Sequence, residues 1–413
     1  MALASSLAGG DAWALPLEEV LARADAAPEV AAARAGEAAS QEWLRAAGQL
    51  PDPRLVLSVD DFAIEGDTRY RLRDSKRMVG LMQDIPAAKK REAERQQAKA
   101  GLLADGRMRE FVRLAARREA VLAWIQLYFL AQKQSLLEQS AAEIRLRQRA
   151  TAAALAGGGE TDDALESLLD RQMSDDAFDM LDRDMRQARA RLRRVVLTSD
   201  DAVLEATGEL PAWLKNPVAS ADATAGHGDE SANEFANDAA AELNASQARV
   251  GMAEAELRMA EADKDSDWSV EFGVGEDAMG KAMMMAKVNF SLPMFTASRQ
   301  NPRIAAAQRK LEQSKAEHQM RRAEFQRQRE EWRAEEAALT LRIKRLTEET
   351  LPLLTRKIAL AEASYSGGRS SIAALILARE KHLDIRIQAI DLEAERAAVR
   401  ANLYFLSAGS ATQ

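Results

Sequence analysis

Two stretches of the chain change their hydrophobic period from two to about 3.6 at a proline. From 78 to 85 apolar residues alternate with others, and beyond Pro86 the charged run AAKKREAERQQAKA favours a helix. A second stretch, AKVNFSLP, ends at Pro293 and also leads into a charged helical run. Proline removes a sheet hydrogen bond and suits the first turn of a helix. The pattern therefore predicts strand-to-helix junctions at Pro86 and Pro293.

Four segments show the alternation that is typical of strands. In one of them Trp268, Val270 and Phe272 alternate with polar residues or glycine, which predicts one apolar face and one polar face. The charged tract at 69–77 is unsuited to lipid and is expected in an outer loop. Each segment reaches the roughly 9 to 11 residues that a tilted membrane strand requires. The four predicted strands are at about 54–63, 70–84, 267–276 and 281–292.

Long runs rich in Ala, Leu, Glu, Arg and Gln predict helices that dominate the fold. The last of them carries a 4-3-4-3 apolar stripe from Leu383 to Tyr404, and residues 339–353 carry a similar one, as in coiled coils. Helices of this length need antiparallel neighbours. The predicted helices are at about 17–48, 87–155, 161–197, 236–263, 302–365 and 370–406.

The same order of segments occurs twice at a nearly constant spacing, which predicts a tandem duplication. Ala12-Trp13-Ala14 has the form of a signal cleavage site. The expected organisation is a residual signal or flexible N-terminus at 1–14, a first repeat at 15–230 with a tip at 157–161 and a linker at 198–235, a second repeat at 236–408 with a tip at 366–371, and a flexible tail at 409–413.

Composition narrows the function classes. The 413 residues include 47% apolar positions, enough for a sizeable core. The net charge of −8 argues against a nucleic-acid partner, because phosphate binding needs an excess of Lys and Arg. The absence of cysteine excludes disulfides and thiolate metal sites. No run of 18 apolar residues predicts a membrane-spanning helix.

Candidate chemistry is sparse. His227, His318 and His382 lie far apart in the sequence, and none has a second ligand at metal-binding spacing. The run MGKAMMM at 279–285 has thioethers that suit Cu(I), although methionine in lipid contact or in packing is the commoner situation. No phosphate-binding loop, nucleophile elbow or HExxH pattern is present. The sequence therefore predicts neither an enzyme nor a cofactor.

In these features the chain resembles the TolC-type outer-membrane factors over nearly its whole length. The resemblance rests on the two strand-Pro-helix junctions, on the turn ASYSGGRSSIAALI from residue 363, and on the closing AVRANLYFLSAG from residue 398. The stretches GQLPDPRLVLSVDDF from residue 48 and QDIPAAKKR from residue 83 resemble the cation-efflux (CzcC-like) subgroup.

The resemblance implies a mainly α fold with a small β part. A long antiparallel coiled-coil helical barrel would cross the periplasm, and four transmembrane strands per chain would complete a 12-stranded β-barrel in a homotrimer. The expected function is a passive outer-membrane exit duct, opened by rearrangement of the tips, in a tripartite RND efflux system for heavy-metal cations. Its expected partners are outer-membrane lipid, a periplasmic adaptor and a proton-driven inner-membrane pump.

The two tips are the candidate gate and adaptor-docking residues. Known family members carry aspartates six and nine residues after the second tip glycine, where this chain has Ala374 and Leu377. The acids of the first tip are the nearest substitutes, although acids are also favoured at any helix N-terminus. The candidates are Gly157, Gly158, Asp162, Asp163 and Glu166 in the first tip, and Gly367, Gly368 and Arg369 in the second.

Two alternatives stay open at this point. Within the conduit class, a drug or type I protein-secretion outer-membrane conduit would have the same pattern. In a different class, a soluble coiled-coil scaffold would bury the strands at 267–276 and 281–292 in its own core as a hairpin.

Overall fold

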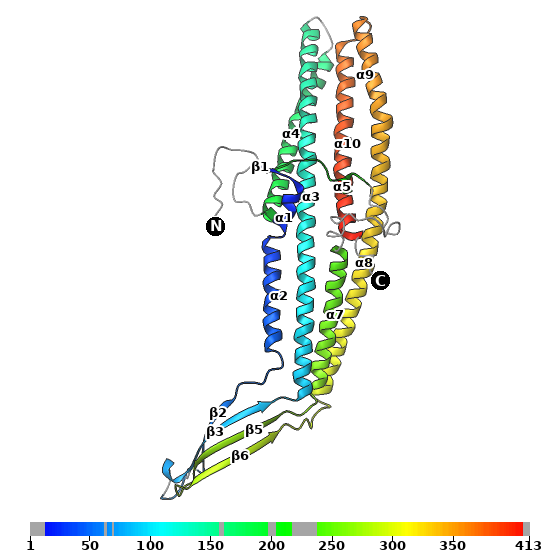
Figure 1. Ribbon diagram of the computed structural model, residues 1–413. Helices are drawn as coiled ribbons and strands as arrows, with labels where there is room; N and C mark the ends of the chain where they lie inside the picture. Colours follow the sequence, from blue (N-terminus) through cyan, green and yellow to red (C-terminus); the bar gives the residue numbers. More distant parts are fainter. Residues whose placement is uncertain are drawn as a thin grey trace. The chain divides into compact units, whose positions relative to one another are not determined.

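The computed structural model describes residues 13–61, 64–67, 70–156, 161–196, 204–216 and 238–407 (Figure 1). Contacts divide the chain into two compact units. Unit 1 comprises Met1–Ala32, Glu110–Ala241 and Ala323–Gln413, and unit 2 comprises Ala33–Arg109 and Glu242–Arg322. Each predicted repeat contributes to both units, and the repeat boundaries themselves stay a prediction.

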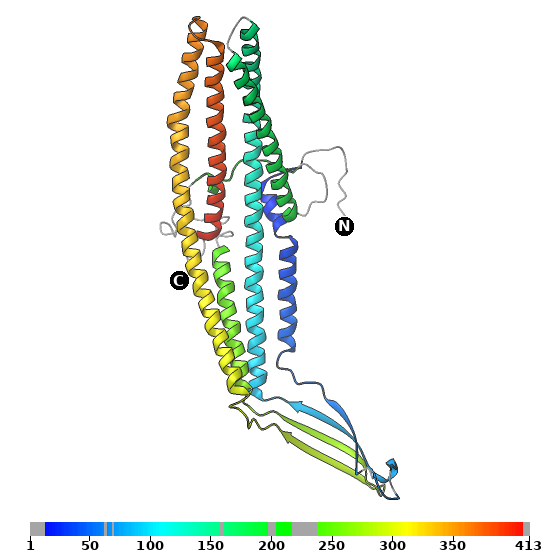
Figure 2. The same ribbon diagram turned by 180° about the vertical axis from the view of Figure 1, so that it is seen from behind.

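Most predicted helices form within one or two residues of their expected bounds. Helix α3 (Ala88–Ala156) pairs with α4 (Thr161–Val196), and α9 (Leu351–Ser366) pairs with α10 (Ile372–Ser407), as both views show (Figures 1 and 2). Helix α7 (Asp238–Ala262) runs beside the first part of α8 (Gln300–Lys344). The prediction of long antiparallel helices is confirmed.

Two predicted helices are interrupted. The helix expected at 17–48 is divided into α1 (Leu17–Ala24) and α2 (Pro28–Ala46). Helix α2 begins at Pro28, which has no N–H to continue the hydrogen bonding of a preceding helix. Just before it, the Arg117 guanidinium donates two hydrogen bonds, of 2.7 and 2.5 Å, to the carboxylate of Asp25.

The helix expected at 302–365 contains a π-helical turn, η2 (Arg345–Thr350), between α8 and α9. Pro352 lies in the first turn of α9 and has no N–H to donate to a preceding carbonyl, so regular α-helical bonding lapses before it. The sequence pattern shows the apolar stripe through this region but not the widened turn.

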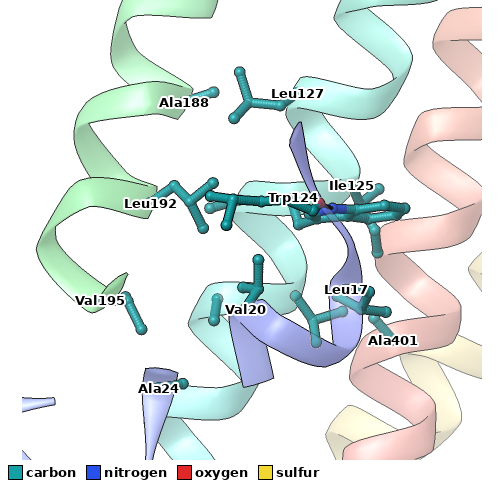
Figure 3. Packing of buried hydrophobic residues seen from close by; sticks show 14 of the residues in the cluster. Leu17, Val20, Ala24, Trp124, Ile125, Leu127, Ala188, Leu192, Val195 and Ala401 are labelled. Carbon is teal, nitrogen blue, oxygen red and sulfur yellow. Dashed lines mark hydrogen bonds between the residues drawn. The ribbon is translucent and has the colours of Figure 1, made fainter. Parts of the chain in front are cut away.

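The core of unit 1 is built around Trp124 on α3, which is fully buried (Figure 3). Its Nε1 donates a 2.8 Å hydrogen bond to the carbonyl of Leu15. Side chains from α1, α4 and α10 surround the ring, among them Val20, Leu192 and Ala401. The predicted stripe of α10 is confirmed by this cluster, since Ile390, Ala394, Ala397 and Ala401 pack in it.

A small parallel sheet in unit 1 joins residues from two predicted segments. Strand β1 (Trp13–Leu15) begins at the end of the segment at 1–14 and pairs with β4 (Leu204–Ala206). The linker expected at 198–235 contains β4 and the short helix α5 (Ala212–Lys215). Leu15, Leu204 and Leu214 are at most 1% exposed, so burial of leucine fixes these segments.

Unit 2 contains the four predicted strands in one antiparallel sheet, ordered β2 (Arg54–Asp60), β3 (Lys76–Ile85), β5 (Trp268–Glu276) and β6 (Ala282–Phe290). The prediction for the second strand is wrong at its start. Tyr70 has φ 60° and residues Leu72–Asp74 form a 3-10 turn, neither of which a strand allows. Lys76 and Arg77 of the charged tract lie in β3, where Arg77 pairs with Glu276 at 2.8 Å.

The sheet has two chemically different faces. One face, here called the apolar face, carries Leu55, Leu57, Val59, Val79, Leu81, Phe272, Val274, Met284, Val288 and Phe290, all of which are at least 47% exposed. The other, here called the glycine face, carries Gly80, Gly273 and Gly275 among polar residues and methionines, including Ser269, Glu271, Met78, Met283 and Met285.

Candidate functional site

The first predicted tip is described only in part. Gly157 and Gly158 lie outside the described residues. Asp162 and Asp163 lie in the first turn of α4, and their side chains are also outside the description. Glu166 lies one turn further along α4, with a side chain that is 68% exposed.

The second predicted tip is a tight helix-to-helix turn. Gly368 has φ +70°, its N–H donates to the carbonyl of Tyr365 at 2.9 Å, and the N–H of Arg369 donates to the carbonyl of Ser364 at 2.9 Å. These two bonds form a Schellman motif, which ends α9. The motif requires the left-handed conformation at Gly368. Gly367 is the C-cap residue of α9. Glycine at 368 is therefore explained by the turn itself.

Helix α10 begins with a side-chain cap and without acids. Ser371 Oγ accepts a 3.3 Å hydrogen bond from the N–H of Ala374, which is the N-cap arrangement. Leu377, one of the two positions compared with the aspartates of TolC-type factors, is 56% exposed. The acidic groups of α10 therefore lie further along the helix.

A buried arginine joins the two helical hairpins. Arg147 on α3 is 6% exposed and donates a 2.8 Å hydrogen bond from Nη1 to Glu380 Oε2 on α10. Its Nη2 forms an ion pair with Asp170 on α4 and lies 4.0 Å from Glu166 Oε2. One guanidinium thus connects helices of both hairpins, and the predicted tip residue Glu166 lies at the rim of this cluster.

Burial dominates the electrostatics of Glu380. Its pKa is raised above the ordinary value of 4.5, first because burial disfavours the charged form and second because Asp170 and Asp384 are nearby. Arg147 opposes this shift. The second carboxylate oxygen, Oε1, is buried without a hydrogen-bond partner and can carry the proton.

Further ion pairs connect α3 to α10. Lys133 lies 2.9 Å from Asp391, and Arg379 lies 3.6 Å from Glu143. Sequence reasoning missed all of these residues, including Arg147. Each lies in a run of mixed charges that reads as a solvated helix face, and no local signal distinguishes the buried arginine from its neighbours.

The junctions are secured by Asp267, a residue that sequence reasoning also missed. Its Oδ1 accepts a 2.9 Å hydrogen bond from the N–H of Ala87, just before α3, and its Oδ2 accepts a 2.6 Å bond from Lys90 Nζ. Its backbone N–H donates to Ser291 Oγ at 2.8 Å, and its carbonyl accepts from the N–H of Ser291 at 2.8 Å. One aspartate therefore contacts both strand-to-helix connections.

The two prolines lie in these connections, but neither lies in the first turn of a helix. Pro86 lies between the end of β3 and the start of α3 at Ala88, and Pro293 lies in a run of turns between β6 and α8. At the start of α3 the carboxylate of Asp267 accepts a hydrogen bond from the backbone N–H of Ala87.

The described residues do not bring histidines and carboxylates together around a metal. They contain no group of three or more His, Cys, Asp or Glu side chains placed to hold a metal ion. His318 Nδ1 lies 2.7 Å from Ser246 Oγ, and burial and Arg386 lower the pKa of His382. His227 lies outside the described residues. No helix in the described part of the chain is long and apolar enough to cross a membrane.

The whole fold is similar to that of solved outer-membrane channels. Neither a protein-family model nor a curated protein matches the chain. Solved structures do match, each over 95% of this chain: CusC (14% identity, 91% of that chain, TM-score 0.75), the Campylobacter jejuni CmeC outer membrane channel (13%, 86%, 0.75) and the Neisseria gonorrhoeae MtrE outer membrane channel in its open state (15%, 89%, 0.73). The chain therefore has the fold of these channels.

The Arg147 cluster predicts a specific pH dependence. Below pH 4.5 Glu380 is protonated in both the folded and the unfolded chain, and above 4.5 the folded chain keeps this proton longer. The stability that the raised pKa provides is thus fully present below pH 4.5 and is lost as pH rises through the folded-state pKa. In Glu380→Gln this contribution is absent, which denaturant unfolding from pH 4 to 8 can measure.

Removal of the arginine is the complementary change. At neutral pH Arg147→Met leaves two carboxylates without their cation and should cost about 3 kcal/mol of unfolding free energy. Arg145→Met, at an exposed position of the same helix, should change it by about 0.5 kcal/mol or less. Equal effects of the two substitutions, or the same pH slope in Glu380→Gln and the natural chain, would show that the cluster carries no special energy.

Proposed function

We propose that this chain is one subunit of an outer-membrane exit duct in a tripartite efflux system. The observation that carries the proposal is the match of 95% of the chain to solved channels, with TM-scores of 0.73 to 0.75. The sheet supports it independently, because an apolar face with side chains such as Leu57 at 72% and Phe272 at 62% exposure suits contact with lipid.

The proposed assembly is a homotrimer. Strands β2 and β6 each have one hydrogen-bonded neighbour in the described sheet, so the backbone of each has an open edge. Open edges are not tolerated in lipid, and three copies of four strands close a 12-stranded barrel wide enough for a passage. In this arrangement the apolar face meets lipid and the glycine face lines the passage.

The helices would form the periplasmic part of the duct. The 69 residues of α3 extend about 100 Å at 1.5 Å per residue, a length suited to crossing a periplasm. The α3–α4 and α9–α10 turns would meet a periplasmic adaptor, and the energy would come from an inner-membrane RND pump. The duct itself would be passive.

The Arg147 cluster would act as the latch between the hairpins. It joins α3 and α4 to α10 through Glu380 and Asp170, so separating the hairpins at this level requires breaking buried ion pairs. Breaking such pairs is costly without a partner that stabilises the open state. In this proposal the cluster takes the place of the aspartates that family members carry after the second tip glycine.

Heavy-metal cations are the proposed cargo. The support is the resemblance of the segments starting at Gly48 and Gln83 to the cation-efflux subgroup, together with the net charge of −8. An acidic interior favours cations in a pore.

A deletion strain tests the cargo. Loss of the gene should raise sensitivity to zinc, cobalt, cadmium or copper, measured as the minimum inhibitory concentration, and the gene on a plasmid should restore it. Dyes and bile salts are the control, and sensitivity to these instead of metals would show that the duct serves drug efflux. Unchanged sensitivity to both would contradict an efflux role.

Charge reversal tests the latch. Arg147→Glu places three carboxylates together, so it should open the duct and let a large antibiotic such as vancomycin leak in, with a fall in inhibitory concentration of about fourfold or more. Adding Glu380→Arg restores one attractive pair and should reverse part of the leak. Arg145→Glu is the matched control. A closed duct in Arg147→Glu, with normal amounts of protein in the membrane, would rule out the latch.

A further inference from the structure

Methionines gather on the glycine face of the sheet. The register aligns Met78 of β3 with Gly275 of β5 and Met283 of β6 in one row across three strands. In the next row Gly80, Gly273 and Met285 are aligned. Two thioethers therefore flank a glycine in the first row, and a third lies beside them.

The glycines leave space that the methionine side chains enter. A Cβ atom added to Gly275 would lie 2.8 Å from Met78 Cγ, and one added to Gly273 would lie 3.5 Å from Met285 Cε. Met285 thus reaches over β5 from the side of β6, while at Gly275 both the backbone and the side chain of Met78 lie close, its Cα also at 2.8 Å. A side chain at Gly275 is also excluded by the backbone, since its Cβ would lie 2.0 Å from the carbonyl oxygen of Arg77.

Burial supports a cluster. Met78 is 7% exposed and Met283 and Met285 are half-buried. Met284, which points to the apolar face between them, is 83% exposed. Met78, Met283 and Met285 are therefore less exposed than Met284 on the opposite face.

The spacing suits a shared ligand. Strands lie about 4.8 Å apart, so the Cα atoms of Met78 and Met283 are about 10 Å apart with only a glycine between them. Met283 and Met285 lie about 7 Å apart along one strand, on the same face. Three flexible side chains at these positions can bring their sulfur atoms together above Gly275.

We propose that Met78, Met283 and Met285 form a thioether site for a soft monovalent cation, Cu(I) or Ag(I). Thioether sulfur prefers such ions over zinc, calcium or magnesium. It carries no proton, so binding at this site does not compete with protonation of its ligands. Glu271, 6% exposed in the adjoining row and 3.9 Å from Lys287, adds a nearby carboxylate.

The binding site stands on the sheet alone. Its position inside a passage, and any contact with a transported ion, rest on the proposed function. The competing explanation is that these methionines only fill the space above glycine, in which case they have no preference for a soft ion.

Silver titration of the full chain in detergent micelles tests the site. Ag(I) serves as the probe because it is soft and is not oxidised in air. With the 15 methionines carrying ¹³C-methyl groups, the signals of Met78, Met283 and Met285 should shift together and saturate at one silver ion per chain, while that of Met284 stays in place. Calorimetry then gives the affinity.

Matched variants decide between binding and packing. Met78→Leu, Met283→Leu and Met285→Leu keep nearly the same volume, so the sheet should fold, and each should weaken silver binding at least tenfold. Met284→Leu should leave it unchanged. Unsaturable binding, or equal losses in Met284→Leu and Met283→Leu, would overturn the site. Such a failure would not affect the efflux and leak assays, which test the duct without reference to silver.

Discussion

The hydrogen-bonding requirement of a β-strand is the constraint on which the proposed assembly depends. The sheet of unit 2 has strands β2 and β6 at its two edges, and each has a row of backbone groups without a partner in the described sheet. Its apolar face exposes large side chains, and contact of these side chains with water is unfavourable. Lipid satisfies that face but cannot satisfy the edges. Only further strands can do that, which is why the proposed duct needs several copies of the chain.

The helical part follows a different principle. One cluster of its core surrounds Trp124, and alanine at several α10 positions there lets helices approach closely. Nearer the hairpin ends the linkage between α3 and α10 is ionic, through Arg147 and Glu380. Apolar packing fixes the position of a helix. A buried ion pair can instead exchange its partner when another protein supplies a competing charge. The proposed latch lies where charged side chains connect the helices.

Periodicity predicted most of the fold. The two strand-to-helix changes at Pro86 and Pro293, the four strands and the long helices were all visible, because each element is long and amphipathic. The break before α2 had a local signal in Pro28, whereas the contact of Asp25 with Arg117, which lies 92 residues away, was not visible. The π-helical turn depends on a local constraint of the backbone. The pairing of β1 with β4 depends on burial between segments that are remote in the sequence.

The candidate site was predicted less well. Glycine at 367 and 368 marked the second turn correctly, since only the backbone geometry of that turn demands it. The charged groups that join the hairpins were missed, because Arg147, Asp170 and Glu380 come from three helices and meet only after folding. Asp267 was missed for the same reason, as its partners Ala87 and Lys90 lie in the other predicted repeat.

The mass of the native protein tests the central claim most directly. Cells that express the chain are fractionated, the membrane fraction is extracted in mild detergent, and the extract is analysed by native mass spectrometry. We expect the protein in the membrane fraction as a particle of three copies of the 45.3 kDa chain. A monomer that remains soluble without detergent would contradict the duct, because its sheet edges and apolar face would then have to be satisfied within one chain.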